Sequence, residues 1–173
     1  MRSVKTRFLL RDRTRESQSV MDLSASYTLT ASPTHIWDLL IDPDVVAACL
    51  PGCDRLEPIG EDQYRAALTL VAASVSGQYS ATVSILDKQP PRSYRLLVDG
   101  TGKRGFVKGE VTIALEALDE DTIIHVNGQG HVGGLIARVG QRLLGSVSKM
   151  LMDRFFAGIQ QKLIPDPESP NPD

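Results

Sequence analysis

The sequence predicts one α+β domain in which a curved antiparallel β-sheet packs against a single long C-terminal helix. Three observations lead to this fold class. Residues 63–132 alternate between apolar and polar side chains, residues 133–163 change to a helical period, and one or two short helices precede most of the strands. A chain of 173 residues is long enough to bury the core that such a domain needs.

The domain proper begins with a strand in "SYTLT", where Tyr27 and Leu29 alternate with threonines. Ser32 and Pro33 then have the character of an N-cap and a first helical residue, which predicts a helix in "THIWDLL". Asp42-Pro43 ends that helix and can begin a second one, since a residue before proline avoids the α conformation. Pro51-Gly52 then forces a turn.

The middle of the chain contains five segments that each have one apolar face. Turn signals rich in glycine, proline and aspartate separate them, so consecutive segments form antiparallel hairpins. Together with the first strand they predict a sheet of about six to seven strands. The segments are "QYRAALTLV", "GQYSATVSIL", "SYRLLV", "VKGEVTIALEAL" and "IIHVNGQGHV".

The last part of the chain changes to helical spacing from "GGLIARVG" onward. Ile136, Val139, Leu143, Val147 and Met150 form one apolar stripe. The pattern predicts one helix of roughly 27 residues, about 40 Å long. A sheet that curls around such a helix encloses space between its concave face and the helix, which is a helix-grip architecture.

The composition is that of an ordinary globular protein. Apolar residues make up 42 % of the chain, and no run approaches the eighteen apolar residues of a membrane span. Residues 1–20 lack the apolar stretch of a secretory signal. We therefore expect a cytoplasmic protein, which could also act as a peripheral protein at the inner face of the cytoplasmic membrane.

Residues 1–20 form a basic extension in front of an acidic domain. They contain six basic and two acidic side chains, whereas residues 21–173 contain thirteen basic and nineteen acidic ones. An acidic body argues against nucleic acid as the main partner. We expect residues 1–20 to be a disordered tail, a targeting or membrane-surface arm, or a segment upstream of a start at Met21. The domain then covers residues 21–164, and residues 165–173 form a disordered tail of acids and prolines.

The chain contains three notable motifs, which are Pro51-Gly52-Cys53, the Gly-Phe-x-x-Gly run from Gly105 to Gly109, and Gly-Gly-x-x-Ala-x-x-Gly-x-Arg from Gly133 to Arg142. Together they resemble the CoxG family of carbon monoxide dehydrogenase subunits, which belongs to the START-like (SRPBCC) superfamily. The resemblance covers roughly Leu23 to Leu163. It implies a START-like fold with a lipophilic cavity, and an accessory role beside molybdenum hydroxylases of the carbon monoxide dehydrogenase type. That role would be in maturation, membrane recruitment or electron transfer to quinone.

Family members that recruit an enzyme carry a long tail with a hydrophobic anchor, whereas ten residues follow Leu163 here. We therefore expect carriage of a hydrophobic molecule, a quinone or another lipid, more than anchoring by the C-terminus. Nine aromatic residues would leave a mostly aliphatic cavity, suited to an isoprenoid tail. No covalent cofactor or metal is expected. The residues expected to line the cavity are Leu50, Leu70, Val83, Leu96, Val98, Phe106, Val111, Val126, Leu135, Val139 and Leu143.

Cys49 and Cys53 are the two cysteines of the chain, and they allow three interpretations. A structural zinc site needs four ligands, and the three histidines are scattered. A disulfide would be reduced in the cytoplasm unless the pair senses redox state. We favour a turn at the rim of the cavity in which Gly52 supplies a permissive φ and Cys53 is a small buried residue.

No catalytic residues are predicted. His125 is the best candidate base, but its strand position does not decide whether it faces the cavity or solvent. The glycines of "DGTGKRGFVKGE" precede a strand, so they predict a hairpin with Phe106 as a lid residue and argue against a phosphate-binding loop. We expect a non-enzymatic binding protein. The alternatives are a START-fold cyclase or hydrolase and an assembly factor without a ligand.

Overall fold

The computed structural model describes residues 7–12 and 18–163, and the side chains of residues 19–163. In these ranges all eight strands form one antiparallel sheet in the order β1-β2-β8-β7-β6-β5-β4-β3. The elements are β1 (Arg7–Asp12), β2 (Gln18–Leu29), α1 (Pro33–Leu40), α2 (Pro43–Cys49), β3 (Cys53–Gly60), β4 (Gln63–Leu70), the 3-10 helix η1 (Ala73–Val75), β5 (Gly77–Gln89), β6 (Ser93–Gly102), β7 (Gly105–Leu118), β8 (Asp121–Gly133), the 3-10 helix η2 (Gly134–Val139) and α3 (Gln141–Leu163).

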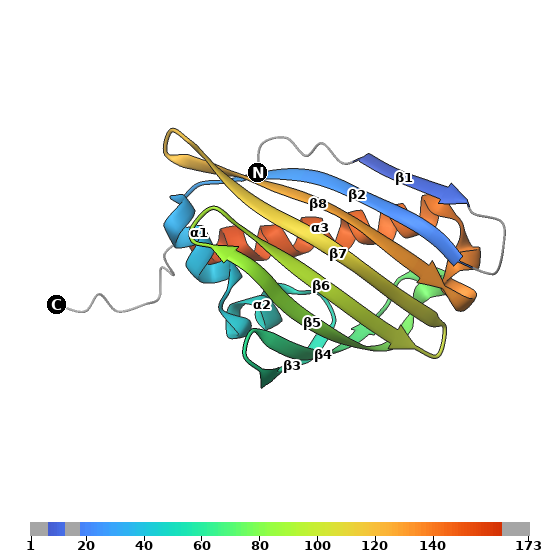
Figure 1. Cartoon of the computed structure of the whole chain (residues 1–173). Helices are drawn as coiled ribbons and strands as arrows, with labels where there is room; N and C mark the ends of the chain where they lie inside the picture. Colours follow the sequence, from blue (N-terminus) through green and yellow to red (C-terminus); the bar gives the residue numbers. More distant parts are fainter. Residues whose placement is uncertain (1–6, 13–17, 164–173) are drawn as a thin grey trace.

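The arrangement confirms the predicted fold class. Figure 1 shows α3 lying across one face of the curved sheet, with α1 and α2 gathered near its C-terminal end. The short helices begin as expected, because Ser32 Oγ accepts the His35 N–H and Asp42 Oδ1 accepts the Asp44 N–H. No helix in the described ranges is long and apolar enough to cross a membrane.

The basic extension differs from the expected disordered segment. Residues 7–12 form the edge strand β1, in which Arg7 lies opposite Ser24 and Asp12 opposite Ser19. Strand β2 also begins earlier than predicted, at Gln18. An added strand satisfies backbone groups that would otherwise leave the edge of β2 open. Residues 1–6, 13–17 and the predicted C-terminal tail lie outside the described residues.

The long helix is attached to the sheet near its C-terminal end through Tyr27. The Tyr27 ring stacks on Phe156 with a centroid distance of 4.3 Å, and its hydroxyl donates to Asp153 Oδ1 at 2.8 Å. Gln160 Nε2 donates to Thr30 Oγ1 at 2.7 Å, one turn further along α3. These contacts belong to a large core cluster. Its buried members are Ala25, Tyr27, Leu29, Ile36, Trp37, Leu40, Cys49, Tyr94, Ile113, Ile124, Val126, Phe156 and Ile159.

A second, smaller core cluster lies at the other end of α3. Its buried residues are Val75 of η1, Val132 of β8, Ile136 of η2 and Leu144 of α3. The chain thus closes the two ends of the helix-sheet interface with different elements. Helices α1 and α2 close one end, and the two 3-10 helices close the other.

The last helix is shorter than predicted. It has 23 residues and begins at Gln141, while "GLIARV" forms the 3-10 helix η2. Gly140 separates them with φ +90°, a conformation that ends regular helix and that few side chains tolerate. The apolar stripe therefore belongs to two elements, and the buried residues of α3 include Leu144, Phe156 and Ile159.

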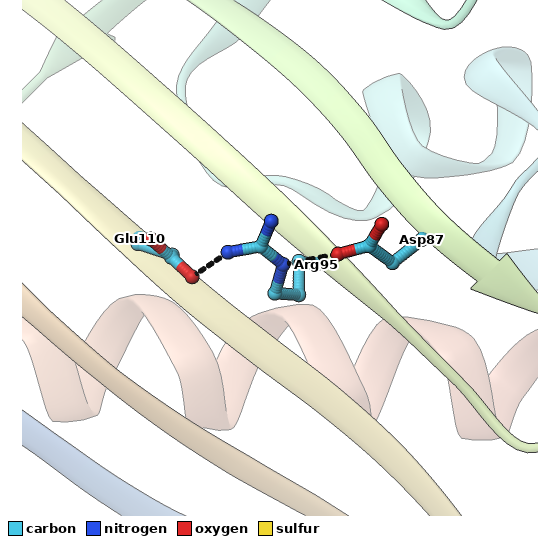
Figure 2. Close-up of polar contacts among 3 residues, drawn as sticks. All are labelled: Asp87, Arg95 and Glu110. Carbon is cyan, nitrogen blue, oxygen red and sulfur yellow. Dashed lines mark hydrogen bonds and ion pairs between the residues drawn. The ribbon is translucent and has the colours of Figure 1, made fainter.

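The convex face of the sheet carries charged side chains. Figure 2 shows Arg95 on β6 between two carboxylates of the neighbouring strands. Its Nε donates to Asp87 Oδ2 at 2.7 Å, and its Nη1 donates to Glu110 Oε1. Such cross-strand ion pairs suit a face that stays in water. A site for an apolar molecule is therefore to be sought on the concave face.

The Pro51-Gly52 turn has the predicted geometry. Gly52 has φ +75°, and the Cys53 N–H donates to the Leu50 carbonyl at 3.1 Å. The Gly52 carbonyl also accepts the Thr69 N–H at 2.7 Å, which fastens the turn to the end of β4. A Cβ atom at position 52 would lie 2.1 Å from the Thr69 carbonyl oxygen. The prediction of a permissive φ at Gly52 is confirmed.

Substitution of Gly52 tests this constraint. We expect Gly52→Ala to lower the free energy of unfolding by at least about 2 kcal/mol, because the new Cβ adds a backbone clash to left-handed strain. Urea unfolding followed by circular dichroism measures the change. Gly100→Ala is the control, since its Cβ would meet Ala81 at an ordinary 3.6 Å. Equal stability of the two variants would contradict the explanation.

Candidate functional site

The middle of the concave face carries aliphatic side chains that belong to neither core cluster. Val83 on β5 lies directly opposite Val98 on β6, and both face the same side as the buried Tyr94. Leu96 and Val111, the next inward pair across β6 and β7, only border the large cluster. All four remain partly exposed. Solvent therefore still reaches these side chains of the concave face.

Small residues occupy the same face beside these aliphatic ones. Gly109 on β7 lies between Val98 on β6 and Gly130 on β8, and Gly100 lies opposite Ala81. These glycine and alanine positions carry no side chain beyond a methyl group, so the sheet cannot reach toward α3 there. The core is therefore packed at both ends of the helix-sheet interface and thin in the middle.

Four of the eleven predicted ligand-binding residues lie in this region, and the others are spread over the surrounding elements. Six of the eleven lie on the concave face, and one of these six, Val126, is a buried member of the large cluster. Three more lie in the turn after α2, in η2 and in α3. The six are Leu70, Val83, Leu96, Val98, Val111 and Val126, and the three are Leu50, Val139 and Leu143. Leu135 is not brought together with them, since it is 56 % exposed on η2.

Phe106 also lies apart from this group. It precedes the inward-facing Val107 on β7, so its side chain points to the opposite face, where it lies against Gly133. A Cβ on Gly133 would come within 2.2 Å of the Phe106 ring. A Cβ on Gly105 would lie 2.1 Å from the Gly133 carbonyl oxygen. The second and third family motifs thus pack against each other, and Phe106 covers the end of β8 instead of forming a lid.

A pocket of about 770 Å³ lies where the β4–β5 connection meets the turn between β6 and β7. None of the predicted ligand residues lines it. Arg104 Nη1 donates to the Ser74 carbonyl at 3.1 Å, and Asp54 Oδ2 accepts the Thr69 hydroxyl at 2.6 Å. Its lining combines two cations and the Asp54 carboxylate with hydroxyl, amide and apolar groups. The lining residues are Asp54, Ala67, Leu68, Ser76, Gly77, Gln78, Tyr79, Ser80, Thr101, Gly102, Lys103 and Arg104.

The two cysteines are free and have different surroundings. Cys49 is buried against α3, where a Cβ on Gly158 would lie 3.1 Å from its Sγ. Cys53 is half-buried, and its Sγ donates to the Arg55 carbonyl at 3.5 Å. Burial raises the pKa of both thiols. In residues 7–12 and 18–163, no group of three or more histidine, cysteine, aspartate or glutamate side chains could hold a metal ion.

His125 faces the convex side of the sheet. Its Nδ1 lies 3.1 Å from Ser26 Oγ, and its Nε2 lies 2.7 Å from Glu116 Oε2. The order of hydroxyl, imidazole and carboxylate is that of an activated serine. However, the row crosses three strands whose backbones pair in the sheet ladder, so they offer no free N–H groups to stabilise an oxyanion. The geometry does not favour acyl transfer.

Thiol labelling tests the interpretation of the cysteines. Because a raised pKa leaves less thiolate at a given pH, iodoacetamide should label Cys49 and Cys53 more slowly in the folded protein than in urea near neutral pH. The rate should increase with pH. Mass spectrometry after peptide digestion separates the two sites. Rapid labelling of Cys53, or a disulfide in the purified protein, would support a redox pair instead.

A serine-directed probe tests the row on the convex face. We expect a fluorophosphonate to leave Ser26 unmodified, because the row lacks an oxyanion site. His125→Ala should also leave hydrolysis of a p-nitrophenyl ester at the background rate of the wild type. Labelling of Ser26 that disappears in His125→Ala would show that the row is a nucleophilic site.

Comparisons with known proteins agree with this structure. The family model for the CoxG subunit of carbon monoxide dehydrogenase matches residues 26–164. A conserved protein from Geobacillus kaustophilus is 40 % identical, with a TM-score of 0.80 over 82 % of this chain and 94 % of that one. No curated protein sequence matches significantly.

More distant solved structures share the fold alone. A START superfamily protein from Mycobacterium smegmatis has a TM-score of 0.66 at 11 % identity, over 82 % of this chain and 95 % of that one. Norcoclaurine synthase from Thalictrum flavum has a TM-score of 0.58 at 16 % identity, over 92 % and 98 %. The chain therefore belongs to the CoxG family of carbon monoxide dehydrogenase subunits and has a START-like fold.

Proposed function

We propose that this CoxG-family protein is a non-enzymatic accessory protein of a molybdenum hydroxylase of the carbon monoxide dehydrogenase type. It binds a hydrophobic molecule, a quinone or another lipid, between the concave face of the sheet and α3. It acts in the cytoplasm or at the inner face of the cytoplasmic membrane, and assists enzyme maturation, membrane recruitment or electron transfer to quinone. The family membership supports the partner class.

The observation that carries the ligand is the thin middle of the concave face. Val83 and Val98 lie there partly exposed, between two clusters that hold α3 in place. Burying roughly 300 Å² of apolar ligand surface would contribute about 7 kcal/mol before the cost of ordering. The lining is aliphatic around Gly100 and Gly109, which suits a flexible isoprenoid chain more than a stacked planar cofactor.

Filling this space should remove ligand binding. We expect Val98→Trp to weaken binding of decylubiquinone at least tenfold, because the indole occupies volume that the ligand needs. Isothermal titration calorimetry measures the affinity. Leu97→Trp is the matched control, since Leu97 directly precedes Val98 on β6, faces the convex side and is 40 % exposed. It should bind like the wild type.

Two further results would decide between the alternatives. Native mass spectrometry and lipid extraction should find an isoprenoid bound to the purified wild-type protein. If the purified protein contains no lipid and also fails to bind decylubiquinone, the alternative of an assembly factor without a ligand would be favoured. Val98→Trp should still co-purify with molybdenum hydroxylase subunits, so loss of both activities together would argue that one surface serves ligand and partner.

A further inference from the structure

The two ends of the molecule differ in charge. One end consists of the β4–β5 connection, the β6–β7 turn, η2 and the start of α3, and we call residues 71–76, 103–104 and 134–142 the basic end. They contain four basic side chains and no carboxylate. The basic residues are Lys103, Arg104, Arg138 and Arg142.

The opposite end consists of three hairpin turns, and we call residues 61–62, 87–92 and 116–121 the acidic end. It contains seven carboxylates against Lys88 and Arg92. The net charge of −2 for the chain therefore conceals a strong polarity along the strands. The carboxylates are Glu61, Asp62, Asp87, Glu116, Asp119, Glu120 and Asp121.

Among residues 19–163, the carboxylates nearest the basic end do not form ion pairs with its cations. Asp54 of β3 lines the same pocket as Lys103 and Arg104 and accepts a hydrogen bond from Thr69. Asp99 of β6 lies 3.9 Å from Lys108, which is outside the basic end. Within residues 19–163, no ion pair engages the four cations of the basic end. All four cations are exposed to solvent.

The basic end also carries the two most exposed large apolar side chains of the described residues. Val71, just before η1, is 88 % exposed, and Leu135 of η2 is 56 % exposed. Arg104 links the segments near these two side chains. Its side chain donates to the Ser74 carbonyl of η1 at 3.1 Å, and its backbone carbonyl accepts the Ile136 N–H of η2 at 2.8 Å. Exposed apolar side chains beside cations are the pattern of proteins that bind the interface of anionic membranes.

We propose that the basic end docks on an anionic lipid bilayer, with Val71 and Leu135 inserted among the acyl chains and the four cations against the headgroups. The pocket beside Lys103 and Arg104 gives a headgroup room to enter. A membrane is favoured over an acidic protein because the same end combines four cations with two strongly exposed apolar side chains, Val71 and Leu135. This inference rests on the proposed function and adds a membrane-docking surface to it. Vesicle binding needs no quinone, so it can be measured separately.

Vesicle flotation with the full chain tests the docking surface. The protein should bind vesicles of phosphatidylcholine mixed with phosphatidylglycerol, bind phosphatidylcholine alone weakly, and lose affinity as salt is raised. Lys103→Gln with Arg138→Gln should weaken binding roughly 25-fold, since each charge near the surface contributes about fivefold. Val71→Ser with Leu135→Ser should weaken it about tenfold or more.

Matched controls come from the acidic end. Arg92→Gln removes one exposed cation and Leu118→Ser removes a leucine that is 48 % exposed, and both should bind vesicles within about twofold of the wild type. Circular dichroism and Tm measurements confirm that each variant is folded. Unchanged binding in both double variants would overturn the proposal and point to residues 1–20 or another surface.

Two other outcomes would also overturn the proposal. One is no preference of the wild type for anionic vesicles. The other is that the wild type binds no vesicles and the double variants lose association with the hydroxylase. This result would show that the basic end binds a protein. The ligand is independent of these results. Val98→Trp should lose decylubiquinone and keep vesicle binding, so failure of either proposal can be told from failure of the other.

Discussion

The attachment of α3 at its two ends is the constraint on which the rest of the structure depends. Near the C-terminal end, Tyr27 stacks on Phe156 and donates to Asp153, and α1 and α2 complete a large cluster. At the other end, Val132, Ile136 and Leu144 form a small one. Because the helix is supported at both ends, the sheet in between can carry glycine and valine without loss of the fold. The two clusters thus leave the middle of the concave face less densely packed than its ends.

The small cluster in turn depends on glycine contacts between distant parts of the chain. Gly105 and Gly134 have φ values of +141° and +76°, and a Cβ on Gly134 would lie 2.7 Å from the Gly105 Cα. The Phe106 ring covers Gly133, and the Arg104 carbonyl accepts the Ile136 N–H. The β6–β7 turn is therefore fastened to η2 by contacts that exclude side chains. The glycines of the second and third family motifs are thus needed for the same contact between the β6–β7 turn and η2.

The sequence predicted the elements that follow a strong periodicity and missed those that depend on distant contacts. The period of two predicted the strands from 63 to 132, and the concave-face residues Val83, Val98 and Val111 followed from it. The helical period did not show that Gly140 separates η2 from α3. Phe106 was misplaced although its neighbour Val107 lies on the inward face, so the parity of β7 already contained the answer.

Other features could not be read from the chain in one dimension. Strand β1 is stabilised by pairing with β2, and its basic composition resembles that of a disordered tail. The face of His125 depends on the register of β2, β8 and β7, which brings Ser26 and Glu116 to it. The pocket is built from β3, three other strands and two connections, so no local pattern predicts it.

The unequal size of the two core clusters connects the interior with the basic end. The large cluster has thirteen buried members, whereas the small one has four, and three of these four lie on η1, η2 and the first turn of α3. Fewer buried contacts make a segment easier to open locally. A hydrophobic molecule that moved between the interior and a bilayer would therefore cross the small cluster. Of its elements, η1 follows Val71 closely in the chain and η2 carries Leu135. Docking by the basic end would place the weaker closure of the interior against the membrane, where its apolar residues could separate without exposure to water.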